Sequence, residues 1–135
     1  MFDYDFKLFD LAAVTTCNAT INATATIIDV GAGLIEANAV IDVTAIEIAS
    51  DDELYTLTVQ GSTSSTFASV VQDLAILELG AKEVLNYGDV DSTIGRHILP
   101  LRNERDGVTY QYLRLICDVT GDVTTGITFS AYLGK

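Results

Sequence analysis

The sequence predicts an all-β fold, an antiparallel sandwich of about eight strands with little or no helix. Apolar and polar residues alternate with a period of two in several segments, as in strands that bury one face. Turn-forming residues separate these segments at intervals typical of sandwiches, and no helical periodicity lies between them. With 135 residues, 49% of them hydrophobic, the chain is expected to form one domain, residues 1–135, with a solid core.

The first expected strand lies at the N-terminus, where large apolar residues alternate with charged ones. The apolar positions are Phe2, Tyr4, Phe6 and Leu8. Residues 1–11 are either a strand of the domain's own sheet or an extended arm that adds to the sheet of a neighbour. Residues 12–26 are small, polar and β-branched and predict an extended stretch with weak strand content, and residues 26–30 predict a short strand.

Three strands are expected in the middle of the chain. Within residues 40–48 the apolar positions change parity, which predicts a β-bulge. Residues 53–61 alternate regularly. Residues 70–79 fit either a strand with a bulge or a short helix, and their pattern favours the strand. The positions of the second strand expected to face the core are Tyr55, Leu57 and Val59.

Turn signals and a proline organise the following segment. Residues 80–95 are rich in Gly, Asn and Asp and predict an exposed loop. Residues 98–101 predict an edge strand or a strand end, because Pro100 cannot donate a hydrogen bond to a neighbouring strand. Residues 103–107 are a strong turn signal.

The last quarter of the chain has the clearest alternation. Strands are expected at 109–119 and 127–133, joined as a hairpin by the Thr-, Gly- and Asp-containing residues 120–126. The positions expected to face the core are Leu113, Leu115, Cys117, Val119, Ile127, Phe129, Ala131 and Leu133.

The charge of the chain limits its partners. The net charge is −12, from 19 acidic and 7 basic residues, so nucleic acid and anionic membrane surfaces are expected to repel it. The sequence has no apolar run long enough for a membrane span. Its N-terminus also lacks the basic start and following apolar stretch of a secretory signal, so synthesis in the cytoplasm is expected. The basic residues of the second half are expected to pair with nearby acids; they are Arg96, Arg102, Arg105 and Arg114.

The residue types that carry catalysis or bind metals are scarce. His97 is the only histidine and precedes an apolar strand, so a structural role is expected for it. Cys17 and Cys117 are expected to be thiols, with Cys117 on the core face, and they do not make a zinc site with one histidine. The acidic groups at 51–53 and 89–91 do not match a calcium loop, so solvated turns are expected there. The sequence therefore predicts a structural or binding module, with no enzyme activity, cofactor or metal.

Short segments spread along the chain carry a resemblance to a known family. They are residues 8–10, 13–16, 28–31, 57–62, 67–69, 112–115, 119–121 and 126–128. In this order they resemble the small jelly-roll cement, or decoration, proteins of tailed-bacteriophage capsids. The chain departs from the family in its low-glycine middle and in the acidic loop at 86–93.

The resemblance implies a fold, a location and partners. It implies a jelly roll of two four-stranded sheets. It also implies copies, commonly homodimers with trimers as the alternative, on the outer surface of an icosahedral virion made in a bacterial host. The implied partner is the major capsid protein, whose subunits the cement protein would bridge.

Two groups of residues are candidates for these contacts. The candidates for the capsid contact are Phe2, Tyr4, Phe6 and Leu8. Tyr110, Tyr112 and Arg114 have the outer parity of the strand at 109–119 and are candidates for the interface between copies; the alternative is a face covered by the protein's own loops. A carbohydrate-binding jelly roll that uses Tyr110 or Tyr112 is the alternative function.

Overall fold

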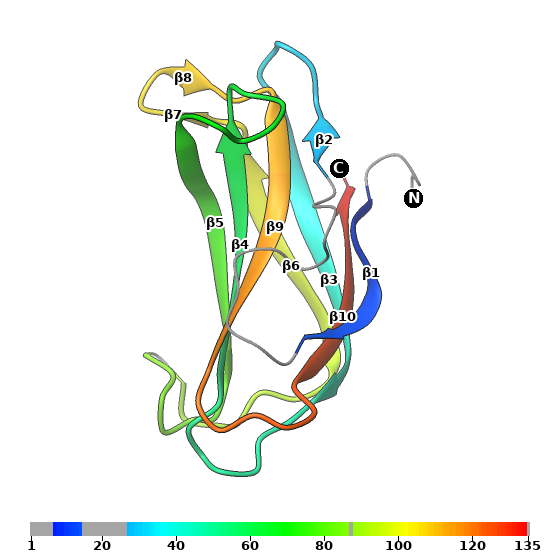
Figure 1. Ribbon diagram of the computed structural model, residues 1–135, viewed down its shortest axis with the longest axis vertical. Coiled ribbons are helices and arrows are strands. Elements are labelled where there is room, and N and C mark those ends of the chain that lie inside the picture. Colours follow the sequence, from blue (N-terminus) through cyan, green and yellow to red (C-terminus); the bar gives the residue numbers. More distant parts are fainter. Residues whose placement is uncertain (1–6, 15–26, 87, 135) are drawn as a thin grey trace.

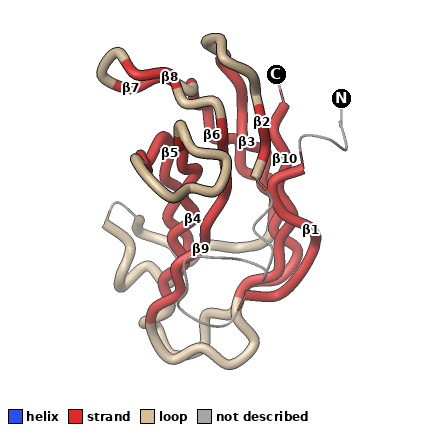
Figure 2. The backbone as a smooth tube through the Cα atoms, turned by 45° about the horizontal axis from the view of Figure 1, so that its top comes forward, coloured by secondary structure: helices blue, strands red, loops and turns tan. Residues whose placement is uncertain are grey.

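The described part of the chain contains strands and no helix (Figures 1 and 2). The computed structural model describes residues 7–14, 27–86 and 88–134. The all-β prediction is confirmed. The strands are β1 (Lys7–Val14), β2 (Ile28–Asp29), β3 (Glu36–Ile46), β4 (Leu54–Ser62), β5 (Val71–Gly80), β6 (Gly95–Arg102), β7 (Glu104–Arg105), β8 (Val108–Thr109), β9 (Tyr112–Thr120) and β10 (Ile127–Gly134).

Eight of these strands form two antiparallel sheets of four. Sheet A has the order β1-β10-β3-β6, and sheet B has the order β2-β9-β4-β5. The remaining two strands, β7 and β8, form a small hairpin. Four of the strand pairs are nested, which means that each pair lies in the sequence between the two strands of the pair before it. In order they are β1 with β10, β2 with β9, β3 with β6 and β4 with β5.

The inner faces of the two sheets share one core. Ile41 and Phe129 from sheet A and Leu57 and Leu113 from sheet B are fully buried in the same cluster. All eight core positions expected in β9 and β10 are buried, and so are the three expected in β4. The alternation therefore predicted the buried faces correctly.

The expected hairpin between the last two strands is wrong. β9 pairs with β2 and β4 in sheet B, whereas β10 pairs with β1 and β3 in sheet A. Residues 121–126 therefore cross from one sheet to the other. A strand with one buried face satisfies its apolar pattern equally well beside its neighbour or across the core from it, so the alternation and the turn residues do not distinguish the two arrangements.

Two predicted irregularities occur within strands. Thr128 pairs with Ala45 and Phe129 with Val43, so the register shifts at Thr44 of β3, within the segment where the bulge was expected. In β5, the partners of Val59 and Gln60 skip Leu74, so the ambiguous segment is a strand with a bulge. Pro100 lies in β6, at the edge of sheet A, as predicted.

The N-terminal strand belongs to the domain's own sheet. β1 lies at the other edge of sheet A and pairs with β10, which favours the own-strand interpretation for residues 7–14. Leu8 is 2% exposed and lies in the core, so its assignment as a capsid contact is wrong. The other candidates of that group, Phe2, Tyr4 and Phe6, lie outside the described residues, as do the stretch 15–26 and Cys17. No helix of the described residues could span a bilayer.

Candidate docking surface

The connections between strands that the structure describes lie at two ends of the sandwich (Figure 1). The upper end consists of residues 30–35, 63–70 and 103–111. The lower end consists of residues 47–53, 81–86, 88–94 and 121–126. Each of the two ends therefore gathers segments that are far apart in the sequence.

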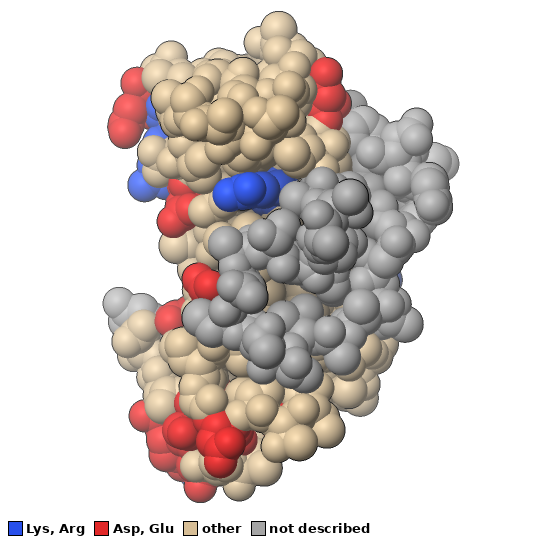
Figure 3. Space-filling view, in the orientation of Figure 1, with Lys and Arg blue, Asp and Glu red and all other residues tan. Residues whose placement is uncertain are grey.

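The two ends differ strongly in charge. The lower-end segments contain eight acidic residues and one lysine, whereas the upper-end segments contain only Glu104, Arg105 and Asp106 as charged residues. Figure 3 shows acidic side chains gathered at the lower end and a front surface at the upper end that is mostly without charge. Of the two ends, the upper end is thus the one that another acidic surface would repel less.

Arg114 is held on the outer face of sheet B by a chain of polar contacts. Its Nε donates to Oε1 of Gln60 at 3.0 Å, and Nε2 of Gln60 donates to Oδ1 of Asp73 at 2.9 Å. The guanidinium carbon lies 4.3 Å from the centre of the Phe67 ring, an arrangement that favours a cation–π interaction. Burial lowers the pKa of Arg114. The side chain is therefore fixed by its own sheet and loop.

The loop that carries Phe67 is strained and cross-linked. The hydroxyl of the buried Ser62 donates to the carbonyl of Ser69 at 2.8 Å and accepts the N–H of Ser64 at 3.0 Å. Phe67 and Val70 have φ angles of 55° and 44°, in the left-handed region that non-glycine residues, and β-branched ones above all, avoid. This conformation leaves Phe67 8% exposed and Val70 59% exposed. The loop therefore buries its aromatic ring and presents a valine.

A buried amide ties two upper-end connections together. Asn103 is fully buried; its Nδ2 donates to the carbonyls of Gly33 and Tyr110 at 2.9 and 3.0 Å, and its Oδ1 accepts the N–H of Ile35 at 2.7 Å. The sequence assigned Asn103 only to a turn. Two of its three partners, Gly33 and Ile35, lie about 70 residues away, and no local pattern indicates them.

The hairpin β7–β8 completes the upper end. Asp106 and Gly107 both have positive φ angles, of 54° and 84°, as the two central residues of a tight hairpin turn do. Nη1 of Arg105 donates to the backbone carbonyl of Asp73 at 3.4 Å, which joins the hairpin to β5. Val108 is 42% exposed on this hairpin.

The upper end therefore presents apolar side chains on a fixed framework. All three of its connections contribute an exposed large apolar residue, and the first residue of β5 adds another. These residues are Leu34, Val70, Val71 and Val108. Exposed apolar groups on segments that are already ordered can bind a protein surface at a low cost in conformational entropy.

One of the three candidates for the interface between copies is buried, and the other two are partly exposed. Tyr110 is 4% exposed, so its expected place on the outer face is wrong. It precedes the first residue of β9, and the parity of the strand does not extend to it; instead it packs over Gly61. Tyr112 is half-buried and pairs with Ser62 and Asp29. Arg114 is partly covered by Phe67, as in the alternative of a face covered by the protein's own loop.

The four arginines use their charges in different ways. Nε of Arg96 binds Oδ1 of Asp42 at 2.7 Å, and Arg102 lies 3.9 Å from Glu36. Arg105 and Arg114 bind a backbone carbonyl and an amide oxygen instead. Among the described residues, the expectation of local ion pairs is therefore confirmed for Arg96 and Arg102.

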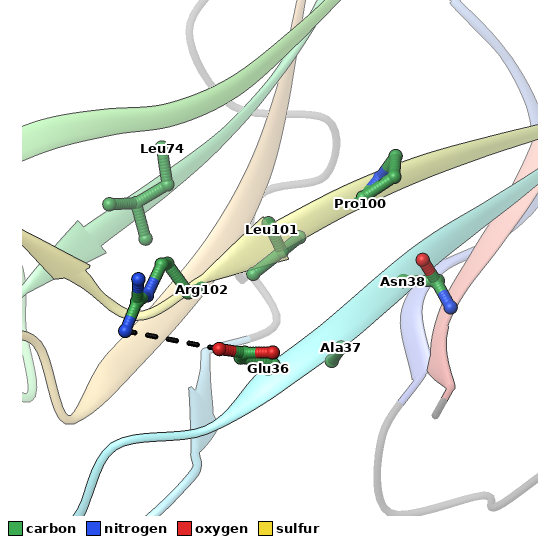
Figure 4. Close-up of a pocket in the computed structure, with 7 residues that line it drawn as sticks. All are labelled: Glu36, Ala37, Asn38, Leu74, Pro100, Leu101 and Arg102. Atoms are coloured by element: carbon green, nitrogen blue, oxygen red, sulfur yellow. Dashed lines mark ion pairs between the residues drawn. The ribbon is translucent and has the colours of Figure 1, made fainter.

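An open groove of about 560 Å³ adjoins the upper end (Figure 4). Leu74 of β5 lies on one side, and Ala37 and Leu101 of the paired strands β3 and β6 lie on the other. Glu36 and Arg102 form the ion pair at its margin, and Asn38 and Pro100 complete the lining. The apolar side chains and the exposed ion pair of this groove could contact a side chain of a partner. The residues that line the groove include neither a pair of acids nor a nucleophile with a neighbouring base.

The lower end uses its carboxylates to accept backbone hydrogen bonds. Oε1 of Glu53 accepts the N–H groups of Ala49 and Ser50, both at 2.7 Å, and Oδ1 of Asp52 accepts that of Asp122 at 3.1 Å. Glu53 is fully buried, so the expectation of a solvated turn is wrong for this residue. Burial acts to raise the pKa of Glu53, but these backbone hydrogen bonds outweigh it and lower the pKa.

The metal-binding residue types are dispersed in the described part of the chain, and the histidine lies within sheet A. No group of three or more His, Cys, Asp or Glu side chains among residues 7–14, 27–86 and 88–134 could hold a metal ion. His97 pairs with Ile41, and its Nε2 is buried without a hydrogen-bond partner.

Two comparisons by sequence found no relative of this chain. No family model matches the chain, and no curated protein matches its sequence.

Proposed function

We propose that this chain is a structural virion protein, a cement or decoration protein that binds the outer surface of an icosahedral phage capsid. It would bridge subunits of the major capsid protein and stabilise the shell. The ordered resemblance of short segments to that family is the first support. The second is the antiparallel architecture of two four-stranded sheets, which such a protein is expected to have.

We infer that the sheets are wound as a jelly roll. The four nested pairs are those of one long, bent hairpin. One half of it contains β1 to β4, the other contains β5, β6, β9 and β10, and the two halves meet at the β4–β5 turn. Rolling this hairpin brings β10 beside β3 and β9 beside β4, the two further pairings in the sheets. Such a winding is the jelly roll that the resemblance implies.

The observation that carries the proposal is the contrast between the two ends. The upper end is almost uncharged, is cross-linked by Asn103 and Ser62, and presents exposed apolar residues. The lower end concentrates carboxylates. A protein that docks by its upper end keeps its acidic end in solvent, away from the shell and its packaged DNA.

The mechanism is mechanical. A cement unit that touches two shell subunits adds binding free energy that is lost when the subunits separate. If two copies form a homodimer, the second contact forms at high effective concentration, so modest individual contacts hold firmly. Shells with the protein are then expected to tolerate more heat than shells without it, and equal tolerance would contradict this role.

Binding to preformed shells tests the docking surface. Val70→Asp places a charge on the upper end, and Val90→Asp is the matched control because Val90 is 74% exposed on the lower end. Aspartate tolerates the left-handed conformation of residue 70 better than valine does, so the fold should persist. We expect wild type and Val90→Asp to co-sediment with shells, and Val70→Asp to bind roughly tenfold or more weakly.

The outcomes separate the two parts of the proposal. If wild type does not bind shells assembled without it, the cement function is refuted. If wild type binds and Val70→Asp binds equally well, the function stands and the upper end is not the docking surface.

The carbohydrate-binding alternative gains no support from the geometry. Sugar-binding sheets use exposed aromatic faces, but Tyr110 is buried and Tyr112 is half-buried.

A further inference from the structure

The connection between β9 and β10 crosses from sheet B to sheet A and is held by very few side chains. Val123 packs against the core, and the N–H of Asp122 donates to Asp52. The following residues, 124–126, have no apolar member among those packed on the core. Residues 124–126 must therefore be held by an interaction other than apolar packing.

Glu47 supplies that contact with a single oxygen atom. Its Oε2 accepts the N–H groups of Thr124, Thr125 and Gly126, each at 2.8 Å. Three successive N–H groups that converge on one point form a backbone nest, a structure that binds anions. Gly126 has a φ angle of 72°, in the left-handed region that helps such a turn to form.

The backbone of Glu47 is itself fixed against the same segment. Its N–H donates to the carbonyl of Gly126 at 3.0 Å, and the hydroxyl of Tyr55 donates to the carbonyl of Glu47 at 2.8 Å. The carboxylate is therefore positioned by the body of the sandwich.

The charge of Glu47 is balanced by these amides. Within the described parts of the chain Glu47 takes part in no ion pair, and the lower end around it is strongly acidic. An ionised carboxylate is unfavourable among so many acidic groups unless hydrogen-bond donors stabilise its negative charge. The hydrogen bonds from Gly126, and then from Thr124 and Thr125, lower its pKa, so it stays ionised at neutral pH.

We propose that residues 124–126 are an anion-binding nest selective for carboxylates, and that Glu47 is its built-in ligand. The crossing between the sheets is closed by this ligand, so a vacated nest should accept a small carboxylate from solution.

Hydrogen exchange of the three amides tests the proposal on the full chain. Glu47→Ala vacates the nest, and Glu83→Ala is the matched control because Glu83 is an exposed acid of the same end that accepts no such bonds. We expect the amides of 124–126 to exchange on the order of tenfold faster in Glu47→Ala and unchanged in Glu83→Ala. Sodium formate should slow this exchange again, and sodium chloride at equal ionic strength should not.

Each other outcome contradicts the inference. Unchanged exchange in Glu47→Ala would show that the nest needs no ligand, and equal rescue by chloride would show only charge screening. If Glu47→Ala does not fold, Glu47→Gln takes its place. It keeps an acceptor oxygen without the charge and should show intermediate exchange with partial rescue by formate; exchange identical to wild type would refute the requirement for an anion.

Discussion

Asn103 illustrates how one buried amide can order two distant loops. All three hydrogen bonds of its side-chain amide go to backbone groups. Two of these groups lie in the connection 30–35 and one in the connection 103–111. A backbone group in a buried loop has no strand partner, so a side chain must satisfy it. The upper end keeps its shape through residues of this kind and not through apolar packing alone.

The substitution Asn103→Ala should be strongly destabilising. It leaves the N–H of Ile35 and the carbonyls of Gly33 and Tyr110 without these partners, which should cost about 2–4 kcal/mol of unfolding free energy. Urea denaturation measures the difference. Asn86→Ala is the control, because within the described residues the Asn86 amide makes only solvent-exposed hydrogen bonds to Glu78, and its loss should cost less than about 0.5 kcal/mol. An Asn103→Ala midpoint equal to that of wild type would contradict this role.

At the scale of strands, β4 shows why a glycine can belong to a core. Gly61 has the inward parity of Tyr55, Leu57 and Val59, yet it has no side chain. A Cβ atom there would lie 2.8 Å from both Cδ1 of Leu74 and Cβ of Tyr110. The glycine therefore makes room for the bulge of β5 and for the tyrosine that precedes β9.

Gly61→Ala should therefore destabilise the protein, although alanine suits a strand no worse than glycine. The added methyl group meets Tyr110 near its backbone, where a side-chain rotation cannot move it away, so a loss of about 1–3 kcal/mol is expected. Gly33→Ala is the control, because a Cβ at residue 33 has no neighbour within 4 Å. Thermal unfolding of both variants checks the prediction, and equal losses in the two would contradict it.

The limits of the sequence prediction also lie at this scale. Alternation identified the buried residues of β9 and β10, because burial of one face is a property of each strand alone. It did not identify their partners, since pairing depends on contacts between distant strands, and the two were wrongly joined as a hairpin. Parity also failed at Tyr110, which lies just before the strand begins. The anchoring roles of Asn103 and Glu47 depend on backbone groups far away in the sequence, so no local pattern could indicate them.

For the whole molecule, the uneven charge is the dominant property. The three lower-end connections carry eight acidic residues with a single lysine among them. Their mutual repulsion opposes folding and is screened by salt over about 10 Å at 0.1 M.

Added sodium chloride should therefore raise the unfolding temperature, by roughly 2–6 °C between low salt and 0.5 M. The double variant Asp51→Asn, Asp89→Asn removes two of these charges and should be more stable than wild type at low salt, with a smaller response to salt. Asparagine also tolerates the positive φ angle of residue 51. An identical salt response in both proteins, followed by calorimetry, would show that the lower end is not a source of repulsion.

The position of β10 has a consequence for how this chain is made. It lies between β1 and β3 in the interior of sheet A, and it is the last of the ten strands to be synthesised. Until β10 has emerged, β1 has no neighbour in sheet A and β3 has one unpaired edge, whereas the strands of sheet B all precede β10 in the chain. The strands of sheet B can therefore begin to pair before sheet A is complete, because sheet A needs β10. During that interval an exposed apolar face and an open strand edge are the features that chaperones would have to protect.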